Sequence, residues 1–254
     1  MKLTLIPSTV GAAGPLQYLS SCLVNDAIAL DAGCLGFHAT PQEQARVRDI
    51  FLSHTHMDHL ASLPAFLENA YGGPGDSVTV HASAVTLDSL QRDLFNGRVW
   101  PDFVALAPGG RPFVRLAPFE AGQTLERAGV RVTAVALNHV VPTVGYLLAD
   151  EGGSVAFVSD TGPTEEVWRL ANGRPDLRAV FVEAAFPNRH QARADASGHL
   201  TPATLAGELA KLRRPARLVV IHIKPRYRAE VVQELRALNV PGLEVGEPGA
   251  TYEF

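Results

Sequence analysis

The sequence lacks the features of a disulfide-rich, membrane-spanning or exported protein. Only two cysteines, Cys22 and Cys34, occur among 254 residues, and they form no Cys-x-x-Cys pair. Two cysteines cannot build a disulfide framework, so we expect both to be small buried apolar side chains. No segment approaches the roughly 18 uninterrupted apolar residues of a membrane span, and Pro7 already breaks the opening apolar run. We therefore expect a cytoplasmic protein without a signal peptide.

Charge of either sign is also limited. Lysine and arginine total 22 against 26 aspartate and glutamate, the net charge is −4, and the basic residues form no run. A nucleic-acid-coating surface is therefore not expected, although a local basic pocket is compatible with this composition. The chain contains no internal repeat, and its Gly-rich turns at 72–75 and 108–110 are too short for interdomain linkers. We expect residues 1–254 to form a single α/β domain, with two small halves sharing a core as the alternative.

Strand-like and helix-like segments are interspersed along the chain. Strand character marks residues 3–6, 18–24, 27–31, 49–53, 78–81, 113–116, 130–137, 144–148, 155–159, 179–182, 218–221 and 251–254. Helical patterns cover residues 41–47, 60–70, 84–95, 164–170, 202–212 and 228–238. Residues 25–26 and 151–153 predict hairpin turns, and Thr201 before Pro202 predicts a helix N-terminus. This order favours two packed mixed β-sheets with helices outside, not a parallel βαβ array or an all-β sandwich.

The densest chemical signal lies between a predicted strand and a predicted helix, at residues 53–59 (SHTHMDH). Its four metal-binding residue types are His54, His56, Asp58 and His59. Neutral imidazole and carboxylate are the ligands that zinc prefers outside thiolate sites. His54 and His56 share one face of an extended segment and therefore suit one ion, while Asp58 and His59 can turn toward a second. A solvated histidine-rich loop is the alternative, and four ligand types at this spacing disfavour it.

Metal-binding or acid–base residues also stand where further predicted strands end. Together with the first histidine of the cluster, these residues are His54, His139, Asp160, Glu183 and His222. Functional sites of α/β proteins collect at the carboxyl ends of strands. Taken alone, Asp160 is equally compatible with a turn, and His139 or His222 with a hydrogen-bonded core histidine. Taken together, the five residues predict one shared site.

This order of residues resembles the metallo-β-lactamase superfamily. The pattern His54-x-His56-x-Asp58-His59, followed by His139, Asp160 and His222, matches the superfamily's ligand order over essentially the whole chain. The resemblance implies an αββα four-layer sandwich of two mixed β-sheets flanked by helices, with the metals at one edge.

The same resemblance implies a centre with two zinc ions, for which Mn²⁺ or Fe²⁺ are the other candidates. One ion would be held by His54, His56 and His139. The other would be held by Asp58, His59 and His222, with Asp160 bridging both ions through its two oxygens. A non-enzymatic metal-binding domain is the competing class. Lost ligands would indicate it, and every ligand is retained in this sequence.

A narrower resemblance lies in the second half of the chain. Residues 141–146 (VPTVGY), 182–188 (VEAAFPN), 197–202 (SGHLTP) and 222–225 (HIKP) are similar to class II 3′,5′-cyclic-nucleotide phosphodiesterases. The histidine signature departs from that class at Met57, Pro64 and residues 67–68. The resemblance implies hydrolysis of cyclic AMP or cyclic GMP to nucleoside 5′-monophosphates. The alternatives are another phosphodiester, such as an RNA end, or a lactone or thioester.

The tRNA 3′-end endonuclease, tRNase Z, is a sister branch with similar stretches around Glu183 and His199. Its glutamate and histidine form a proton-relay pair, which makes Glu183 and His199 catalytic candidates beside Asp58. A glutamate buried after an apolar strand also needs a partner. That endonuclease carries a long tRNA-gripping arm between the equivalents of His139 and Asp160. Only 20 residues lie between them here, enough for one hairpin, which disfavours tRNA as the substrate.

The remaining candidates concern the substrate and the surroundings of the metals. Lys224 and Arg226 are candidates for neutralising a phosphate, and Phe186 or Tyr227 for stacking on a base. Exposed charges and core aromatics are the ordinary alternatives. Asp31 resembles a position that supports the metal loop. We expect a small phosphodiester as substrate and neither a membrane nor a nucleic acid as partner, while a homodimer stays open.

Overall fold

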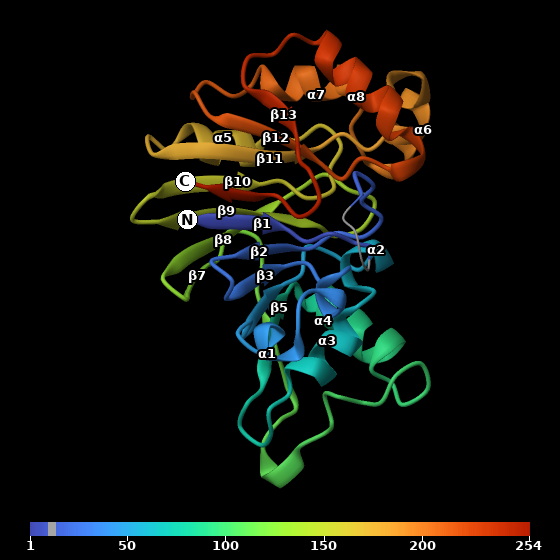
Figure 1. Ribbon diagram of the computed structural model, residues 1–254, viewed down its shortest axis with the longest axis vertical. Coiled ribbons are helices and arrows are strands. Elements are labelled where there is room, and N and C mark those ends of the chain that lie inside the picture. The colour runs from blue at the N-terminus through green and yellow to red at the C-terminus, as the bar shows by residue number, and fades with distance from the viewer. Residues whose placement is uncertain (10–13) are drawn as a thin grey trace.

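Two seven-stranded β-sheets pack face to face in the computed structural model, which describes residues 1–9 and 14–254 (Figure 1). The first sheet has the order β14 (Thr251–Glu253), β1 (Lys2–Leu5), β2 (Cys22–Val24), β3 (Ile28–Leu30), β4 (Asp49–Phe51), β5 (Val78–Ala82) and β6 (Val114–Pro118). The second has the order β13 (Leu243–Val245), β12 (Arg217–Ile221), β11 (Leu177–Glu183), β10 (Gly153–Phe157), β9 (Val144–Asp150), β8 (Val130–Ala136) and β7 (Thr124–Arg127).

Each sheet combines antiparallel and parallel pairs. In the first sheet β14, β1, β2 and β3 pair antiparallel, and β3 to β6 are parallel. In the second, β7 to β10 are antiparallel and β10 to β13 are parallel. The predicted hairpins are present: Asn25 and Asp26 turn between β2 and β3 with φ of 50° and 55°, and β9 returns as β10. Such positive φ values at both turn residues suit the twist of a tight hairpin.

Helices cover the outer face of each sheet. They are α1 (Pro41–Gln44), α2 (Met57–Leu60), α3 (Leu63–Ala70), α4 (Ala84–Ser89), α5 (Glu166–Asn172), α6 (Gln191–Ser197), α7 (Pro202–Leu209) and α8 (Arg228–Ala237). Short helical turns are η1 (Leu35–Phe37), η2 (Leu90–Leu94), η3 (Pro108–Gly110), η4 (Asn188–His190) and η5 (Pro225–Tyr227). Helices α3 and α4 lie on the side of the first sheet, and α5, α7 and α8 on that of the second (Figure 1). Their apolar residues belong to the clusters that pack on those sheets. The predicted αββα four-layer sandwich is therefore confirmed.

The central core lies between the two sheets. Residues from both sheets, including Leu30, Phe51, Phe181 and Val219, are fully buried there in one apolar cluster. Each such side chain contributes about 1.5–3 kcal/mol by leaving water. Because this core joins the first and second halves of the chain, it also fixes the relative position of loops that emerge from the two sheets.

Four elements differ from the sequence-based expectations. The strand predicted over 18–24 begins only at Cys22, because the backbone N–H of Ser20 donates to Asp58 O at 2.7 Å, away from the sheet ladder. The edge strands β7 and β13 were not predicted, since β7 (TLER) has one apolar residue among four and β13 is only three residues long. Helix α6 was missed because Ala194 is its only buried residue. The predicted start of α7 is confirmed, with Thr201 in a capping box and Pro202 in the first turn.

Two findings bear on the expectations about cysteine and membranes. Cys22 and Cys34 are both free and fully buried, as expected. Burial raises the pKa of the Cys34 thiol to about 11, so it is an apolar packing group and not a nucleophile. None of the helices in the described residues is long and apolar enough to cross a bilayer.

Candidate metal centre

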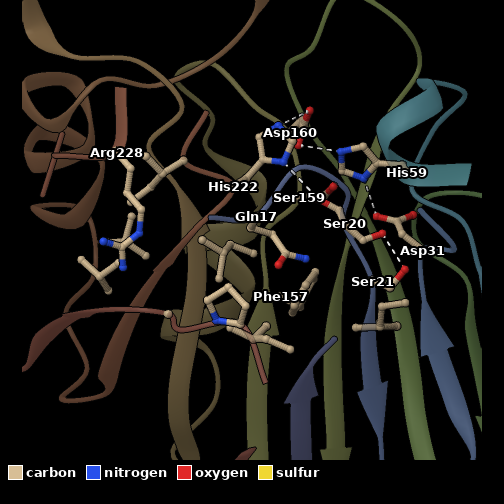
Figure 2. Close-up of a pocket in the computed structure, with 18 of the residues that line it drawn as sticks. Gln17, Ser20, Ser21, Asp31, His59, Phe157, Ser159, Asp160, His222 and Arg228 are labelled. Atoms are coloured by element: carbon tan, nitrogen blue, oxygen red, sulfur yellow. Dashed lines mark hydrogen bonds and ion pairs between the residues drawn. The ribbon is translucent and has the colours of Figure 1, made fainter. Parts of the chain in front are cut away.

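The predicted ligand positions converge at one edge of the sandwich, from loops that follow strands of both sheets. The segment after β4 supplies His54, and the turn into α2 supplies the rest of the histidine cluster. From the second sheet, His139, Asp160 and His222 follow β8, β10 and β12. Figure 2 shows His59, Asp160 and His222 pointing toward one another at one end of a pocket. Side chains far apart in the sequence are thus gathered where strands end, as predicted.

The first group consists of His54, His56, His139 and Asp160, whose donor atoms all lie within 4.8 Å of one another. His54 is completely buried. His139 Nδ1 lies 2.8 Å from the backbone oxygen of Gly198. This contact fixes the ring, so that Nε2 faces the other side chains of the first group. A ring nitrogen bonded to a carbonyl in this way sets the tautomer that a metal-binding imidazole needs.

The second group consists of Asp58, His59 and His222, again with donor atoms within 4.8 Å. Asp160 contacts it as well: Oδ1 is 3.2 Å from His59 Nε2, and Oδ2 is 3.2 Å from His222 Nε2 (Figure 2). The other ring nitrogen of His222 lies 3.1 Å from Ser20 Oγ. Asp160 therefore touches both groups, which is the position that a bridging carboxylate requires.

A buried aspartate outside both groups orients this loop. Asp31 accepts hydrogen bonds from the backbone N–H of Ser53 at 2.7 Å and from Ser53 Oγ at 2.9 Å. Its Oδ2 is also 2.7 Å from His59 Nδ1, so His59 Nε2 is left facing Asp160. Asp31 itself has a left-handed backbone with φ of 59°, and His222 has φ of 55°. Non-glycine residues hold this conformation at a cost of order 1–2 kcal/mol, a strain that clusters at functional sites.

The chemistry of these donors fits divalent cations. Buried His54 Nε2, His59 Nε2 and both Asp160 carboxylate oxygens have no hydrogen-bond partner in the described part of the chain. The Asp160 oxygens have ionic contacts to His59 and His222 at 3.2 Å but no hydrogen bond among the described residues, and His54 Nε2 lies 3.8 Å from Asp160 Oδ2, so these donor atoms stay open to a bound cation. Burial lowers the pKa of His54 to about 2, so it offers a neutral lone pair. Burial would raise the pKa of Asp160, but His222 and His59 hold it well below its usual range, so it is a carboxylate. Neutral imidazole and carboxylate suit zinc, manganese or iron.

A cavity of about 60 Å³ lies behind the second group, between the sheets (Figure 2). Ser20, Ser159 and His222 line its polar end, and Phe157 and Ile221 are among its apolar walls. The space is wide enough to hold water molecules. The candidate ligands His59, Asp160 and His222 therefore border this partly open pocket.

Lys224 lies directly against the second group. Its Nζ is 3.0 Å from Asp58 Oδ2 and 3.0 Å from His222 Nε2. Burial would raise the pKa of Asp58, but its contacts with His222, His59 and Lys224 hold it below its usual range. A positive charge thus already stands beside these donors. The predicted contact with a phosphate requires Lys224 to turn from Asp58 toward the substrate.

Glu183 and His199 form a buried pair beside the two groups. Glu183 Oε1 lies 2.7 Å from His199 Nδ1 and accepts the backbone N–H of Thr161 at 2.8 Å. Burial would lower the pKa of His199, but the Glu183 carboxylate raises it above its usual value. The His199 ring centroid is 5.0 Å from that of His139 and 5.6 Å from that of His222. The geometry that a proton-relay pair needs is present, and the relay itself stays a prediction.

His199 also belongs to a further group of side chains that could hold a metal ion. Asp160, His199 and His222 form a further set whose donor atoms lie within 4.8 Å. His199 Nδ1, however, is 2.7 Å from Glu183 and 4.0 Å from Asp160. The shorter contact pairs Nδ1 with Glu183 and leaves Nε2 available, an arrangement that serves a metal ligand as well as a proton donor. The assignment of His199 as a proton donor outside the ligand set therefore stays a prediction.

The candidate substrate residues occupy different environments. Phe186 is only 8% exposed, with its ring between those of His199 and Tyr227. Tyr227 is partly exposed. Ser20, which contacts His222, was missed by sequence reasoning, since no local pattern distinguishes this serine. The roles of Phe186 and Tyr227 in substrate binding stay predictions.

The comparisons with known proteins agree with this geometry. The family model described as "Beta-lactamase superfamily domain" matches residues 29–223. The chain therefore belongs to the β-lactamase superfamily, and its histidine and aspartate groups place it among the metal-dependent members, the metallo-β-lactamases. It is a metal-dependent hydrolase. The superfamily predicted from the ligand order is thus confirmed.

Individual relatives within the superfamily include phosphodiesterases and ribonucleases. A probable 3′,5′-cyclic-nucleotide phosphodiesterase of Yersinia pestis is 31% identical over 241 residues, covering 82% of this chain and 68% of that protein. A ribonuclease Z of Kineococcus radiotolerans is 29% identical over 234 residues, covering 76% of this chain and 72% of that protein. Among solved structures, unliganded yeast PDE1 is similar with a TM-score of 0.78 and 17% identity, over 98% of both chains. The last similarity concerns the fold alone.

Proposed function

We propose that this chain is a phosphodiesterase that hydrolyses 3′,5′-cyclic nucleotides to nucleoside 5′-monophosphates with two divalent ions, zinc in the first place. The observation that carries the proposal is the buried Glu183–His199 pair, at 2.7 Å, beside two groups of metal-binding side chains. A phosphodiester has an alkoxide leaving group, which needs a proton as it departs. The similarity to a probable cyclic-nucleotide phosphodiesterase supports the same choice.

The chain's own residues define how the ions would be held. His54, His56 and His139 would hold one ion, Asp58, His59 and His222 the other, and Asp160 would bridge. Bound divalent ions supply an activated water and offset the charge on phosphoryl oxygens. Asp31 keeps His59 in the orientation that this assignment requires, through its contact with Nδ1.

His199 and Asp58 carry the proton steps of the proposal. Because Glu183 holds His199 Nδ1, Nε2 is the nitrogen that donates a proton to O3′ when the P–O3′ bond breaks. Asp58 is 26% exposed at the side chain, and it orients the attacking water from the opposite side of phosphorus. Lys224, beside Asp58, neutralises a non-bridging oxygen of the substrate.

Processing of tRNA 3′ ends is the second candidate, and the ribonuclease Z relative favours it. The segment between His139 and Asp160 argues against it, because β9 and β10 form a plain hairpin there. The net charge of −4 also gives no long-range attraction for tRNA.

A substrate panel tests the proposal. Metal-loaded protein is assayed with cyclic AMP, cyclic GMP, bis(p-nitrophenyl) phosphate, a lactone and a precursor tRNA, with a His56→Ala variant as the background control. We expect cyclic nucleotides to give nucleoside 5′-monophosphates, identified by chromatography. Efficient tRNA trimming without turnover of either cyclic nucleotide would replace the proposal with the second candidate. Lactone turnover alone would move the chain to another substrate class.

A further inference from the structure

A row of aromatic and imidazole rings leads from the metal centre to the surface. Ring centroids are 5.6 Å apart from His222 to His199 and 5.7 Å apart from His199 to Phe186. The next steps, from Phe186 to Tyr227 and from Tyr227 to His190, measure 6.0 Å and 5.0 Å. The row therefore starts at a candidate metal ligand and ends on η4, which begins the segment leading into α6.

Arginine side chains face the outer rings of this row. The Arg193 guanidinium carbon lies 5.7 Å from the centroid of the Phe186 ring, and its Nη1 is 3.3 Å from Tyr227 Oη. Arg226 lies 5.9 Å and Arg189 5.7 Å from the centroid of the Tyr227 ring. Cations at such distances from an aromatic face are attracted by it, so these side chains are held in place and not freely extended.

The three arginines differ in charge balance. Arg189 forms a two-pronged pair with Glu230, at 2.7 Å and 3.0 Å. Arg193 and Arg226 are exposed and form no ion pair with any carboxylate of residues 1–9 and 14–254. Two guanidinium groups without an ion pair in the described residues thus both border Tyr227, on a chain whose net charge is −4. Arginine recognises phosphate through paired hydrogen bonds, and arginine with aromatic rings is the usual surface for a nucleotide strand.

The geometry points to a second phosphate subsite, formed by Arg193 and Arg226 on the leaving-group side of His199. This inference rests on the proposed phosphodiesterase chemistry, in which His199 protonates the departing O3′. The nucleoside that carries that O3′ lies along the partly exposed Tyr227, which the buried Phe186 supports, and its own 5′-phosphate reaches the two arginines. The structure thereby assigns a further substrate class, linear dinucleotides with a 5′-phosphate.

The reaction balances as a simple hydrolysis. The oxygen of water bonds to phosphorus, the P–O3′ bond breaks, and O3′ takes the proton held by His199. The water's remaining proton leaves to solvent or restores His199. A dinucleotide with a 5′-phosphate, such as pApA, therefore yields two molecules of adenosine 5′-monophosphate, with no co-reactant besides water.

A matched pair of substrates tests the subsite. pApA and ApA share the scissile bond and differ only in the 5′-phosphate. We expect the wild-type, metal-loaded protein to have a kcat/KM about tenfold or more higher for pApA, the size typical of a charge-assisted hydrogen bond partly screened by solvent. Arg193→Gln should bring this ratio toward one, and Arg226→Gln should lower it in the same direction. Arg189→Gln is the matched control and should keep the wild-type ratio, because Glu230 already neutralises that charge.

The outcomes separate this inference from the proposed function. A wild-type ratio near one, a ratio unchanged in Arg193→Gln, or no cleavage of pApA would each overturn the subsite. Cyclic AMP is assayed with the same preparations. Absent cyclic AMP turnover with a high pApA ratio would overturn the proposed cyclic-nucleotide activity and leave the subsite standing. Melting curves of the variants show whether each is folded.

Discussion

Asp31 lies outside the candidate ligand set but decides which nitrogen of His59 faces the metal groups. Its Oδ2 is 2.7 Å from His59 Nδ1, and its two other hydrogen bonds hold Ser53, the residue before His54. A carboxylate in this position fixes the tautomer of an imidazole and strengthens it as a ligand. A single side chain thus connects the end of β3 with the first turn of the metal loop.

Replacing Asp31 by alanine should weaken metal binding. We expect zinc affinity to fall about 10–100-fold, the usual loss when such an outer partner is removed. Competition with a chromophoric chelator measures the affinity. Asp26→Ala is the control, since that carboxylate is exposed in the β2–β3 turn and pairs only with Lys2 in the described residues. Equal zinc affinities of Asp31→Ala and wild type would show that Asp31 has no role in the metal loop.

His199→Ala should separate proton transfer from metal binding. General acid catalysis contributes about 10²–10⁴-fold, so turnover of cyclic AMP should fall by that order while zinc content is unchanged. Bis(p-nitrophenyl) phosphate releases a stabilised phenolate and should be much less affected. Glu183→Gln should show the same pattern more weakly, because it removes the partner and keeps the donor. Equal losses on both substrates would indicate a binding role, and loss of zinc would make His199 a ligand.

At the scale of elements, the close approach of two backbone segments depends on Gly33. An ideal Cβ placed there would lie 2.0 Å from the backbone oxygen of Asp58 and 2.7 Å from the backbone nitrogen of Ser20. Ser20 in turn donates to Asp58 O at 2.7 Å and accepts from Gly33 at 2.9 Å. The chain before β2 is therefore bonded to the metal loop through a space that only glycine leaves open.

Gly33→Ala should consequently lower both stability and zinc affinity. Overpacking against backbone costs about 1–3 kcal/mol, and this contact is at the upper end because backbone atoms cannot rotate away. Denaturant unfolding and zinc titration measure the two effects. Gly207→Ala on α7 is the matched control, since nothing lies within 4 Å of its added Cβ. That variant should gain up to about 1 kcal/mol from helix propensity. A Gly33→Ala protein as stable as wild type would contradict the steric argument.

Local patterns in the sequence predicted the main elements and the gathering of ligands at strand ends. His54, His139, Asp160 and His222 each follow an apolar run. Such a run consists of neighbouring residues, so it can be recognised from the sequence alone. Contacts made by tertiary structure were not predictable in the same way. Ser20 meets His222 across 202 positions of sequence, and nothing near Ser20 distinguishes it from other serines. Arg193 lies on α6, a helix too polar for its pattern to be recognised.

At the scale of the whole molecule, bound metal should stabilise the fold, because the candidate ligands follow strands of both sheets. A ligand at 100 times its dissociation constant adds about 2.7 kcal/mol, which for a chain of this size corresponds to a rise in Tm of about 5–10 °C. We therefore expect chelation to lower Tm, and zinc to restore it. His56→Ala should reduce both zinc content and the zinc-dependent rise. A Tm that does not respond to chelator or zinc would contradict a metal centre that joins the two sheets.

The candidate ligands come in two sets, one from each sheet, and this arrangement should affect the rate at which metal is released. His54 to His59 follow β4 of the first sheet, and His139, Asp160 and His222 follow strands of the second. If the ions are held as proposed, a displacement of one sheet relative to the other would separate the two sets of ligands, and we expect the ions to be released during such motions. The rate at which bound zinc exchanges with isotopically labelled zinc then reports how often that motion occurs. Phe51→Ala removes a buried side chain from the core between the sheets and replaces no candidate ligand. It should therefore increase the rate of zinc exchange.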